Sequence, residues 1–559
     1  MFEKPNFSKR MNRYFLKGVA ISILLFHSIF IHAQVNEQVE VKRQFKPVLG
    51  EALKIRKSPY FPEETAKTIQ PTYGFKDISL KKDTAANSIQ ADSLHRKDTA
   101  KILPIYLNAA VGSHKTLIGE LYFNTLPSPI GSFSANIRHL SLAGKLQNEK
   151  FSTDQLNLDG KKTLDDNYLA VHFGVEQKSN PFYGYDNSKY SYTASEVKQQ
   201  FRNIVARLDF GKLDDTAQGM HYFAKIGGYY FGDSYSSSET HLDAFGGLAY
   251  SWDNYRFNVQ ADLQNNILTT SPSKFNTSLG RFKPSFTFLT DILRVDLGLN
   301  IVYEIGDRSQ AYVFPDLQMD LQMSEVFSVY GGIKGDILQN TYKNLAALNP
   351  YLLPSNGRIL NSNFNLQNTK QSILVYAGIK GNINPDMTYK AQIDVSQMDR
   401  VPFFENTLAP IDNFTLAYDG NGTILTKLYG ELNYIPSDLF RLNTNITFMD
   451  YRLSNLPKAF YTPGFKLQAL GTYTPLARWS YKGSLSYISS QAVPFIPTGS
   501  SSYTSIKSYI DLNFGVEYKL SHKLAVYLQG NNLFDNKYML FYNYPVIGLN
   551  VLAGLSLRY

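Results

Sequence analysis

The chain has 559 residues, with 39 Tyr, 37 Phe, only 2 Trp and no Cys, and its mean hydropathy of -0.25 is too polar for a bundle of membrane helices. The absence of Cys excludes disulfides, thiol catalysis, zinc-thiolate sites and a lipoprotein anchor. The formal net charge is +9, and because five basic residues belong to the N-terminal 33 positions, the remainder carries too little charge to indicate nucleic-acid binding.

A large aromatic content accompanies this low hydropathy, because Phe, Trp and Tyr make up 14% of the residues. A β protein with one face in lipid and the other in water reconciles the two values. Alternation halves the mean hydropathy, while aromatic girdles at the membrane surfaces raise the Tyr and Phe content.

Residues 1–33 predict a secretory signal peptide. Five basic residues precede an apolar run from Gly18 to Ile31, and Ala33 is followed by Gln34. The run is too short to span a bilayer as a helix. No stop-transfer pattern follows it, which disfavours the alternative of an N-terminal membrane anchor.

Residues 34–104 form a polar segment rich in Glu, Lys, Asp, Thr and Pro, in which apolar periodicity is weak. Such a composition cannot bury enough surface to offset its ordering entropy. We therefore expect a flexible periplasmic N-terminal tail.

Two pieces of this tail are candidates for binding a partner. The alternating stretch 35–42, with Val39 and Val41, resembles the short strand through which transport receptors pair with an energy-coupling protein by β-augmentation, although an arbitrary extended segment is the alternative. The stretch 45–55, which contains Phe45 and Pro47, is apolar enough to dock in the lumen of a barrel or on a protein partner.

From Ile105 onward the chain repeats alternating runs of about ten residues, which is typical of a membrane barrel. The run from Leu293 to Tyr303 is the clearest, because its odd positions are apolar and its even positions include Arg294 and Asp296. A soluble sandwich also alternates, but its core needs apolar side chains from both sheets and its turns are similar in length at both ends.

The connections between these runs alternate between short and long. Tight turns such as 384–386 and 520–522 alternate with long loops near 178–199, 337–370 and 531–548. Counting back from the C-terminus gives 22 strand starts between residues 105 and 549, with Phe414 to Asp419 left open as a separate excursion. The prediction is an all-β, transmembrane antiparallel β-barrel over residues 105–559, in the cell outer membrane, with short turns and both termini in the periplasm.

The last eleven residues form a strand with apolar odd positions that ends on Tyr559. A terminal strand of this length would leave a long unpaired edge unless a barrel closes on it. An aromatic last residue resembles the C-terminal signal by which outer-membrane barrels are recognised by the insertion machinery. Outer-membrane lipid and that machinery are therefore expected partners, with Tyr559 as the insertion signal.

A family resemblance lies near the same end. Residues 530–538, Gly-Asn-Asn-Leu-Phe-Asp-Asn-Lys-Tyr, followed by Tyr544-Pro545 and a glycine-containing strand, resemble the closing loop and strand of TonB-dependent receptor barrels. The plug domain that fills the lumen in that family has no room between Gln34 and Ile105 beyond the polar tail. Residues 123–140 and 158–162, with the Phe45-Lys46-Pro47 segment, look similar to plugless TonB-receptor-like barrels of Bacteroidetes, a resemblance that assigns no specific activity.

The sequence predicts no enzymatic activity, no cofactor and no metal site. His139, His172, His221 and His241 lie in different strands without close ligand spacing, which is typical of chance placement. No nucleophile elbow, P-loop or dinucleotide fingerprint stands in a suitable context. A barrel phospholipase would need a Ser-His pair at the outer rim, and spacing alone does not assemble one.

Two functions fit such a barrel. The first is solute passage or uptake across the outer membrane through the lumen. The alternative is a non-transport scaffold or accessory subunit of an envelope assembly or secretion complex, which binds a periplasmic or outer-membrane protein through its tail and loops.

A barrel this wide would be a hole unless something closes it. The tail, a partner and the 337–370 loop are the candidates. The loop carries the apolar residues Leu345, Leu348, Tyr351 and Leu352, which either fold into the lumen or cap neighbouring loops at the mouth.

Overall fold

The structure is a computed structural model that describes residues 104–126, 128, 130–213, 218–306, 309–355, 364–406, 411–494 and 503–559. The predicted signal peptide, the tail up to residue 103 and its candidate residues Val39, Val41, Phe45 and Pro47 lie outside the described residues. Within the described ranges, no helix has the length and hydropathy of a membrane span.

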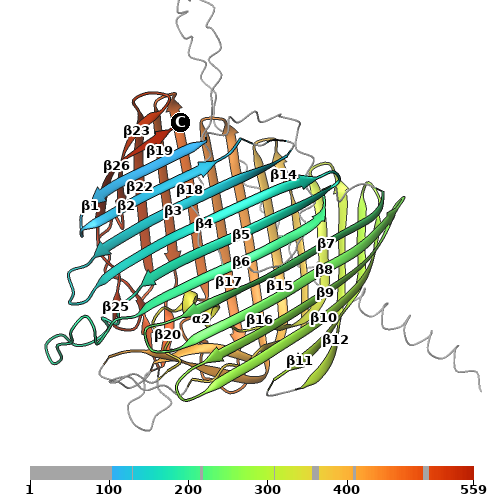
Figure 1. Ribbon diagram of the computed structural model, residues 1–559, viewed down its shortest axis with the longest axis horizontal. Helices are drawn as coiled ribbons and strands as arrows, with labels where there is room; N and C mark the ends of the chain where they lie inside the picture. Colours follow the sequence, from blue (N-terminus) through green and yellow to red (C-terminus); the bar gives the residue numbers. More distant parts are fainter. Residues whose placement is uncertain are drawn as a thin grey trace, which may run out of the picture. The chain divides into compact units, whose positions relative to one another are not determined.

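Twenty-two strands form one antiparallel sheet that closes on itself (Figure 1). Each strand of this sheet pairs with the strands before and after it, and β1 pairs with β26 to complete the ring. The predicted fold class and strand number are confirmed.

The strands of the barrel are β1 (Ile105–Gly112), β2 (Thr116–Asn124), β3 (Gly131–Ala143), β4 (Lys150–Leu164), β5 (Asn167–Ser179), β6 (Gln200–Lys212), β7 (Gly219–Gly232), β8 (Ser238–Trp252), β9 (Tyr255–Thr269), β10 (Lys274–Leu289), β11 (Leu293–Ile305), β12 (Gln310–Ser324), β13 (Phe327–Leu338), β14 (Thr369–Asn384), β15 (Met387–Asn406), β16 (Phe414–Ser437), β17 (Phe440–Arg452), β18 (Phe465–Leu476), β19 (Trp479–Ile488), β22 (Tyr509–Lys519), β23 (Leu524–Asn531) and β26 (Asn550–Arg558). The long connections hold helix α2 (Tyr342–Leu348) and two hairpins, β20 (Gln491–Pro494) with β21 (Tyr503–Ile506) and β24 (Met539–Phe541) with β25 (Tyr544–Pro545).

The two faces of each strand differ as the alternation predicts. In β11, Leu297 on the outer face is 52% exposed, whereas Asn300 on the inner face is 2% exposed and donates from Nδ2 to the carbonyl of Gly335 at 2.9 Å. Outward apolar side chains meet lipid, and inward polar side chains find partners within the wall.

The short connections use residues that tolerate a left-handed backbone. Asp165 between β4 and β5 has a φ of 50°, and Asp253 between β8 and β9 has a φ of 47°. Asp adopts this region more readily than most residues because its short side chain can hydrogen-bond locally. These tight turns lie at one end of the barrel, and the long loops lie at the other.

Two elements differ from the sequence prediction. Strand β16 begins at Phe414, so the 414–419 excursion is part of this strand, and residues 414–421 pair with 399–406 of β15 across a register shift at Met398 and Asp399. The 337–370 loop contains helix α2, whose N-cap is Thr341: its side chain accepts from the backbone N–H of Asn344 at 3.2 Å.

The first and last strands of the described chain pair with each other and close the ring. The backbone N–H of Tyr559 donates to the carbonyl of Ile105 at 2.9 Å, and the N–H of Ile105 donates to the carbonyl of Tyr559 at 3.0 Å. The last residue therefore leaves no unpaired edge at this seam.

Candidate functional site

The connection from β13 to β14, described over residues 339–355 and 364–368, is the candidate site, and we call it the cap. It lies at the long-loop end of the barrel and contacts strands and loops from several parts of the ring. Its contacts form three anchors: a helix seat, an aromatic cluster and a polar network.

The helix seat is the buried carboxylate of Glu239 on β8. The backbone N–H groups of Tyr342 and Lys343 donate to this carboxylate at 2.5 and 3.2 Å. Glu239 is fully buried and also accepts from the Tyr229 hydroxyl at 2.8 Å and the Asn266 amide at 3.1 Å. Four donors around one carboxylate compensate its burial.

The side chains at the start of α2 add to this anchor. The Tyr342 hydroxyl donates to Asp233 at 2.7 Å, and its ring packs edge-on against Phe231 with centroids 5.3 Å apart. Lys343 places its ammonium 3.9 Å from the Tyr229 ring centroid. Burial raises the pKa of Asp233 and lowers the pKa of Lys343. The helix is thus pinned to the wall formed by β7, β8 and β9.

The aromatic cluster lies further along the cap and joins four loops. Tyr351 stacks on Tyr544 from the β23–β26 loop with centroids 3.6 Å apart, and it meets Tyr183 from the β5–β6 loop edge-on at 6.0 Å. The backbone of the cap also pairs with the start of β16, because Leu353 donates to the carbonyl of Phe414 at 2.9 Å and Phe414 donates to that of Tyr351 at 3.0 Å. The cluster buries large aromatic surfaces with no charged side chain among its members.

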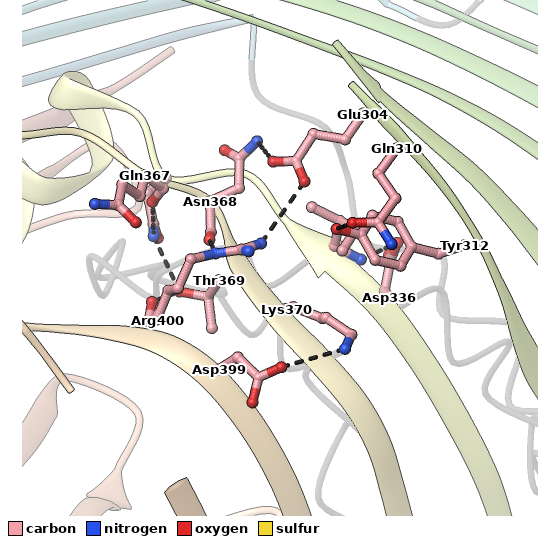
Figure 2. A network of polar contacts seen from close by, with 12 residues as sticks. Glu304, Gln310, Tyr312, Asp336, Gln367, Asn368, Thr369, Lys370, Asp399 and Arg400 are labelled. Carbon is pink, nitrogen blue, oxygen red and sulfur yellow. Dashed lines mark hydrogen bonds and ion pairs between the residues drawn. The ribbon is translucent and has the colours of Figure 1, made fainter. Parts of the chain in front are cut away.

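The polar network ties the C-terminal end of the cap to the wall (Figure 2). Asn368 donates to Glu304 on β11 at 2.8 Å, and Arg400 on β15 donates from Nε to the carbonyl of Asn368 at 2.8 Å. Lys370 pairs with Asp399 at 3.2 Å in the same view. A cavity of about 230 Å³ beside this network is lined in part by Glu304, Gln367 and Arg400.

One ionisable residue, Asp412, contacts two of the loops that pack around the cap. Asp412 donates from its backbone N–H to the carbonyl of Gly184 at 2.9 Å, its carbonyl accepts from the Tyr544 hydroxyl, and its carboxylate accepts from Asn543 at 2.5 Å. Burial raises the pKa of the Asp412 carboxyl to about 6. Proton uptake by this group therefore favours the packed loops.

The wall of the lumen below the cap is polar, and several of its charges are paired. Arg281 on β10 lies between Asp262 at 2.7 Å and Asp336 at 2.9 Å. Lys380 pairs with Asp320 at 2.5 Å on another part of the wall. Pairing offsets the cost of holding these charges in a partly buried position. In the described part of the chain, no group of three or more His, Cys, Asp or Glu is placed to hold a metal ion.

The structure places the sequence-derived candidates in different surroundings. Leu345 and Leu352 are buried in the cluster around α2, and Tyr351 is buried in the aromatic cluster. Leu348 is 45% exposed and joins neither cluster. Tyr559 is exposed at the short-turn end, where the ammonium of Lys523 lies 4.1 Å from its ring centroid.

Sequence reasoning did not single out Glu239 or Arg400, which hold the cap in place. It used Tyr544 only as part of the family resemblance near the C-terminus, and not as a contact of the cap. Glu239 and Arg400 are charged residues on barrel strands, as are many inward-facing residues of this barrel, so no local sequence pattern distinguishes them from their neighbours. A signal was available for Tyr544, because an aromatic residue beside proline in a long outer loop is a candidate for packing.

No family model and no curated protein matches this chain. Solved structures with the same fold include the siderophore receptor PirA from Acinetobacter baumannii, at 13% identity and a TM-score of 0.62 over 81% of this chain and 80% of that one. They also include the ferric enterobactin receptor PfeA from Pseudomonas aeruginosa, at 12% identity and 0.60 over 81% and 80%. The ferric-catecholate import receptor Fiu from E. coli K12 matches at 11% identity and 0.59 over 82% of each chain. The fold is that of outer-membrane receptor barrels.

Proposed function

We propose that this chain is a plugless, TonB-dependent-receptor-like barrel that carries a solute across the outer membrane, with the cap as the closure of its outer mouth. The fold shared with proteins described as siderophore receptors supports an uptake role. The contacts that the cap makes around the ring support its role as the closure.

The cap contacts three separate sectors of the ring. Its helix sits on β7–β9, Leu353 pairs with the start of β16, and Tyr351 stacks on the loop between β23 and β26. In the order of the 22-stranded sheet these sectors are well separated, so one segment crosses the mouth between them. All of these contacts are non-covalent, which makes opening compatible with repeated transport cycles.

The lining below the cap suits a polar solute. Inward-facing charges such as Arg281 and Lys380 are already paired within the wall, so the lining presents hydrogen-bonding groups without a strong field of one sign. Such a surface passes hydrated polar molecules and disfavours apolar ones.

Loop replacement tests the closure. Residues 343–355 are replaced by a short Gly-Ser linker in the full chain, and single-channel conductance is measured in a planar bilayer. We expect conductance to rise and large antibiotics to enter cells. The matched control replaces the exposed segment 186–190 of the β5–β6 loop, which should leave conductance unchanged.

The other outcomes contradict the proposal in distinct ways. Unchanged conductance in the cap variant, with an increase after trimming residues 35–100, would make the tail the closure. If neither change opens the pore, an external partner seals it, and the alternative of a scaffold within an envelope complex gains support.

A further inference from the structure

The register of β3 and β4 assembles three residues into a hydrogen-bonded line. His139 Nδ1 lies 2.6 Å from Asp154 Oδ1, and His139 Nε2 lies 3.1 Å from Ser141 Oγ. Asp154 is the direct cross-strand partner of His139, and Ser141 follows His139 by two residues, so all three side chains share one face of the sheet. A serine, an imidazole and a carboxylate in this order are the components of a nucleophilic triad.

This face is the outer surface of the barrel. Ile137, two residues before His139, is 51% exposed on the same face, whereas Arg138 between them points inward and pairs with Glu120 at 3.1 Å. The side chains of His139 and Asp154 are both about half exposed. The triad therefore faces the membrane and not the lumen.

The triad lies at the edge of the outward apolar band that is nearer to the long loops. The outward row through Ile137 is apolar on the neighbouring strands, with Leu121 on β2 and Leu156 on β4 as its cross-strand partners. In the row of the triad itself, Asp154 lies opposite Gln177 on β5, and Gln177 lies opposite Arg202 on β6, so the outward face becomes polar here. Leu117 on β2, opposite Ser141, is an apolar neighbour of the triad. With the long loops outside the cell, this position corresponds to the ester region of the outer leaflet.

We propose that Ser141, His139 and Asp154 form a lipid-facing esterase site that hydrolyses fatty-acid esters of outer-leaflet lipids. Ser141 is the nucleophile, His139 is the general base and acid, and Asp154 is the positioning residue. This activity is independent of solute passage through the lumen.

The reaction has two balanced halves. Ser141 Oγ attacks the ester carbonyl carbon while its proton passes to His139 Nε2; the ester C–O bond then breaks, and the proton goes from His139 to the leaving alcohol. Water from the membrane surface next attacks the acyl-serine and gives its proton to His139. That proton returns to Ser141 Oγ as the free fatty acid leaves. Asp154 accepts a hydrogen bond from the Nδ1–H of His139 throughout and holds the imidazole in the required tautomer.

Space and polar groups are available for the reacting carbonyl. Gly119 on β2 is the other cross-strand partner of His139, and a Cβ added there would meet nothing within 4 Å, so the imidazole is open on that side. In register, Ser152 lies opposite Ser141 and Gln177 lies opposite Asp154. Their hydroxyl and amide groups are the nearest candidates for donors to the developing oxyanion.

The test uses the purified full-length barrel in phospholipid vesicles, with release of oleate from dioleoyl phosphatidylcholine measured by mass spectrometry. A fluorophosphonate probe in parallel reports the nucleophile as a covalent adduct on the peptide that contains Ser141. We expect oleate release and the adduct in the wild type. Release should fall at least about a thousandfold in Ser141→Ala and His139→Ala.

Two further variants separate chemistry from structure. Asp154→Asn should slow adduct formation by about a hundredfold to ten-thousandfold, because it favours the wrong tautomer, and Asp154→Glu should restore part of the rate. The control is His172→Ala, which removes a lumen-facing histidine held at the same 2.6 Å from Asp159 and should leave release unchanged. Heat-shift electrophoresis confirms that each variant is folded.

Two results would overturn the proposal: a wild-type barrel that neither releases oleate nor forms the adduct, or full release that persists in Ser141→Ala. Vesicles that contain lipopolysaccharide as the acyl donor identify the lipid source. Release of its ester-linked chains, with little from the phospholipid, would assign the site to lipopolysaccharide, and the reverse would assign it to phospholipid.

Discussion

Two histidine-aspartate pairs on neighbouring strands have the same length and opposite surroundings. His139 and Asp154 lie 2.6 Å apart on the outer surface of the barrel, and His172 and Asp159 lie 2.6 Å apart on the lumen side. The outer pair has Ser141 on its second nitrogen and apolar neighbours, while the inner pair belongs to a wall of charges. A histidine-aspartate pair is therefore a catalytic candidate on the outer face, whereas on the lumen face it is one of several polar contacts of the wall.

This contrast extends to the whole sheet. On the lumen side, opposite charges such as Asp320 on β12 and Lys380 on β14 pair within the wall, which offsets part of the cost of holding them there. On the lipid side, a polar group has neither water nor a nearby hydrogen-bond partner. We therefore expect polar side chains there only at functional sites or at the edge of the lipid band.

Tyr559 ends the lipid-facing side of the closing strand, and changing it should have the largest effect. Its backbone pairs with Ile105 in both directions, and its side chain is 64% exposed. Tyr559→Asp should sharply lower the yield of folded barrel in the outer membrane while synthesis and signal cleavage continue. Quantitative immunoblots of membrane fractions measure this, with Tyr559→Phe as the control. An equal yield from both variants would remove the insertion-signal hypothesis.

A matched pair of arginine substitutions compares the two faces directly. Phe514 on β22 points outward, and Phe514→Arg near the bilayer midplane should destabilise the barrel by about 2–4 kcal/mol. Gln468 on β18 points into the lumen and is exposed there, so Gln468→Arg should change stability by less than about 0.5 kcal/mol. Urea unfolding in vesicles gives both values. Similar losses would mean that the facing assignment is wrong.

The smallest effect concerns the loops above the lumen. The pKa of Asp412 is raised to about 6 from an ordinary value of 3.8, so the packed loops bind this proton more tightly than opened loops do. Protonation therefore stabilises the packed loops relative to the opened loops by at most about 3 kcal/mol. This stabilisation is fully present below about pH 4 and is lost as the pH rises through 6. Hydrogen exchange of residues 342–353 between pH 4 and 7, corrected for the intrinsic rate, measures it. The same pH dependence in Asp412→Asn would exclude this carboxyl as the cause.

Much of the barrel could be predicted because its rules are local. A period of two residues assigns each side chain to one face, and turn length separates one end from the other, so the strand number and the outward position of Leu297 follow from the chain alone. The start of β16 could not be predicted, because residues 414–421 extend the strand only by pairing with β15.

The candidate sites depended on the tertiary structure to different degrees. The sequence determined that Leu345, Tyr351 and Leu352 are too apolar for an open loop, but only the fold decided that Tyr351 stacks on Tyr544, almost two hundred positions away. The sequence also placed His139 and Ser141 on one face of one strand. Asp154 joined them only through the register between β3 and β4, which is set by the pairing of whole strands and not by any local spacing.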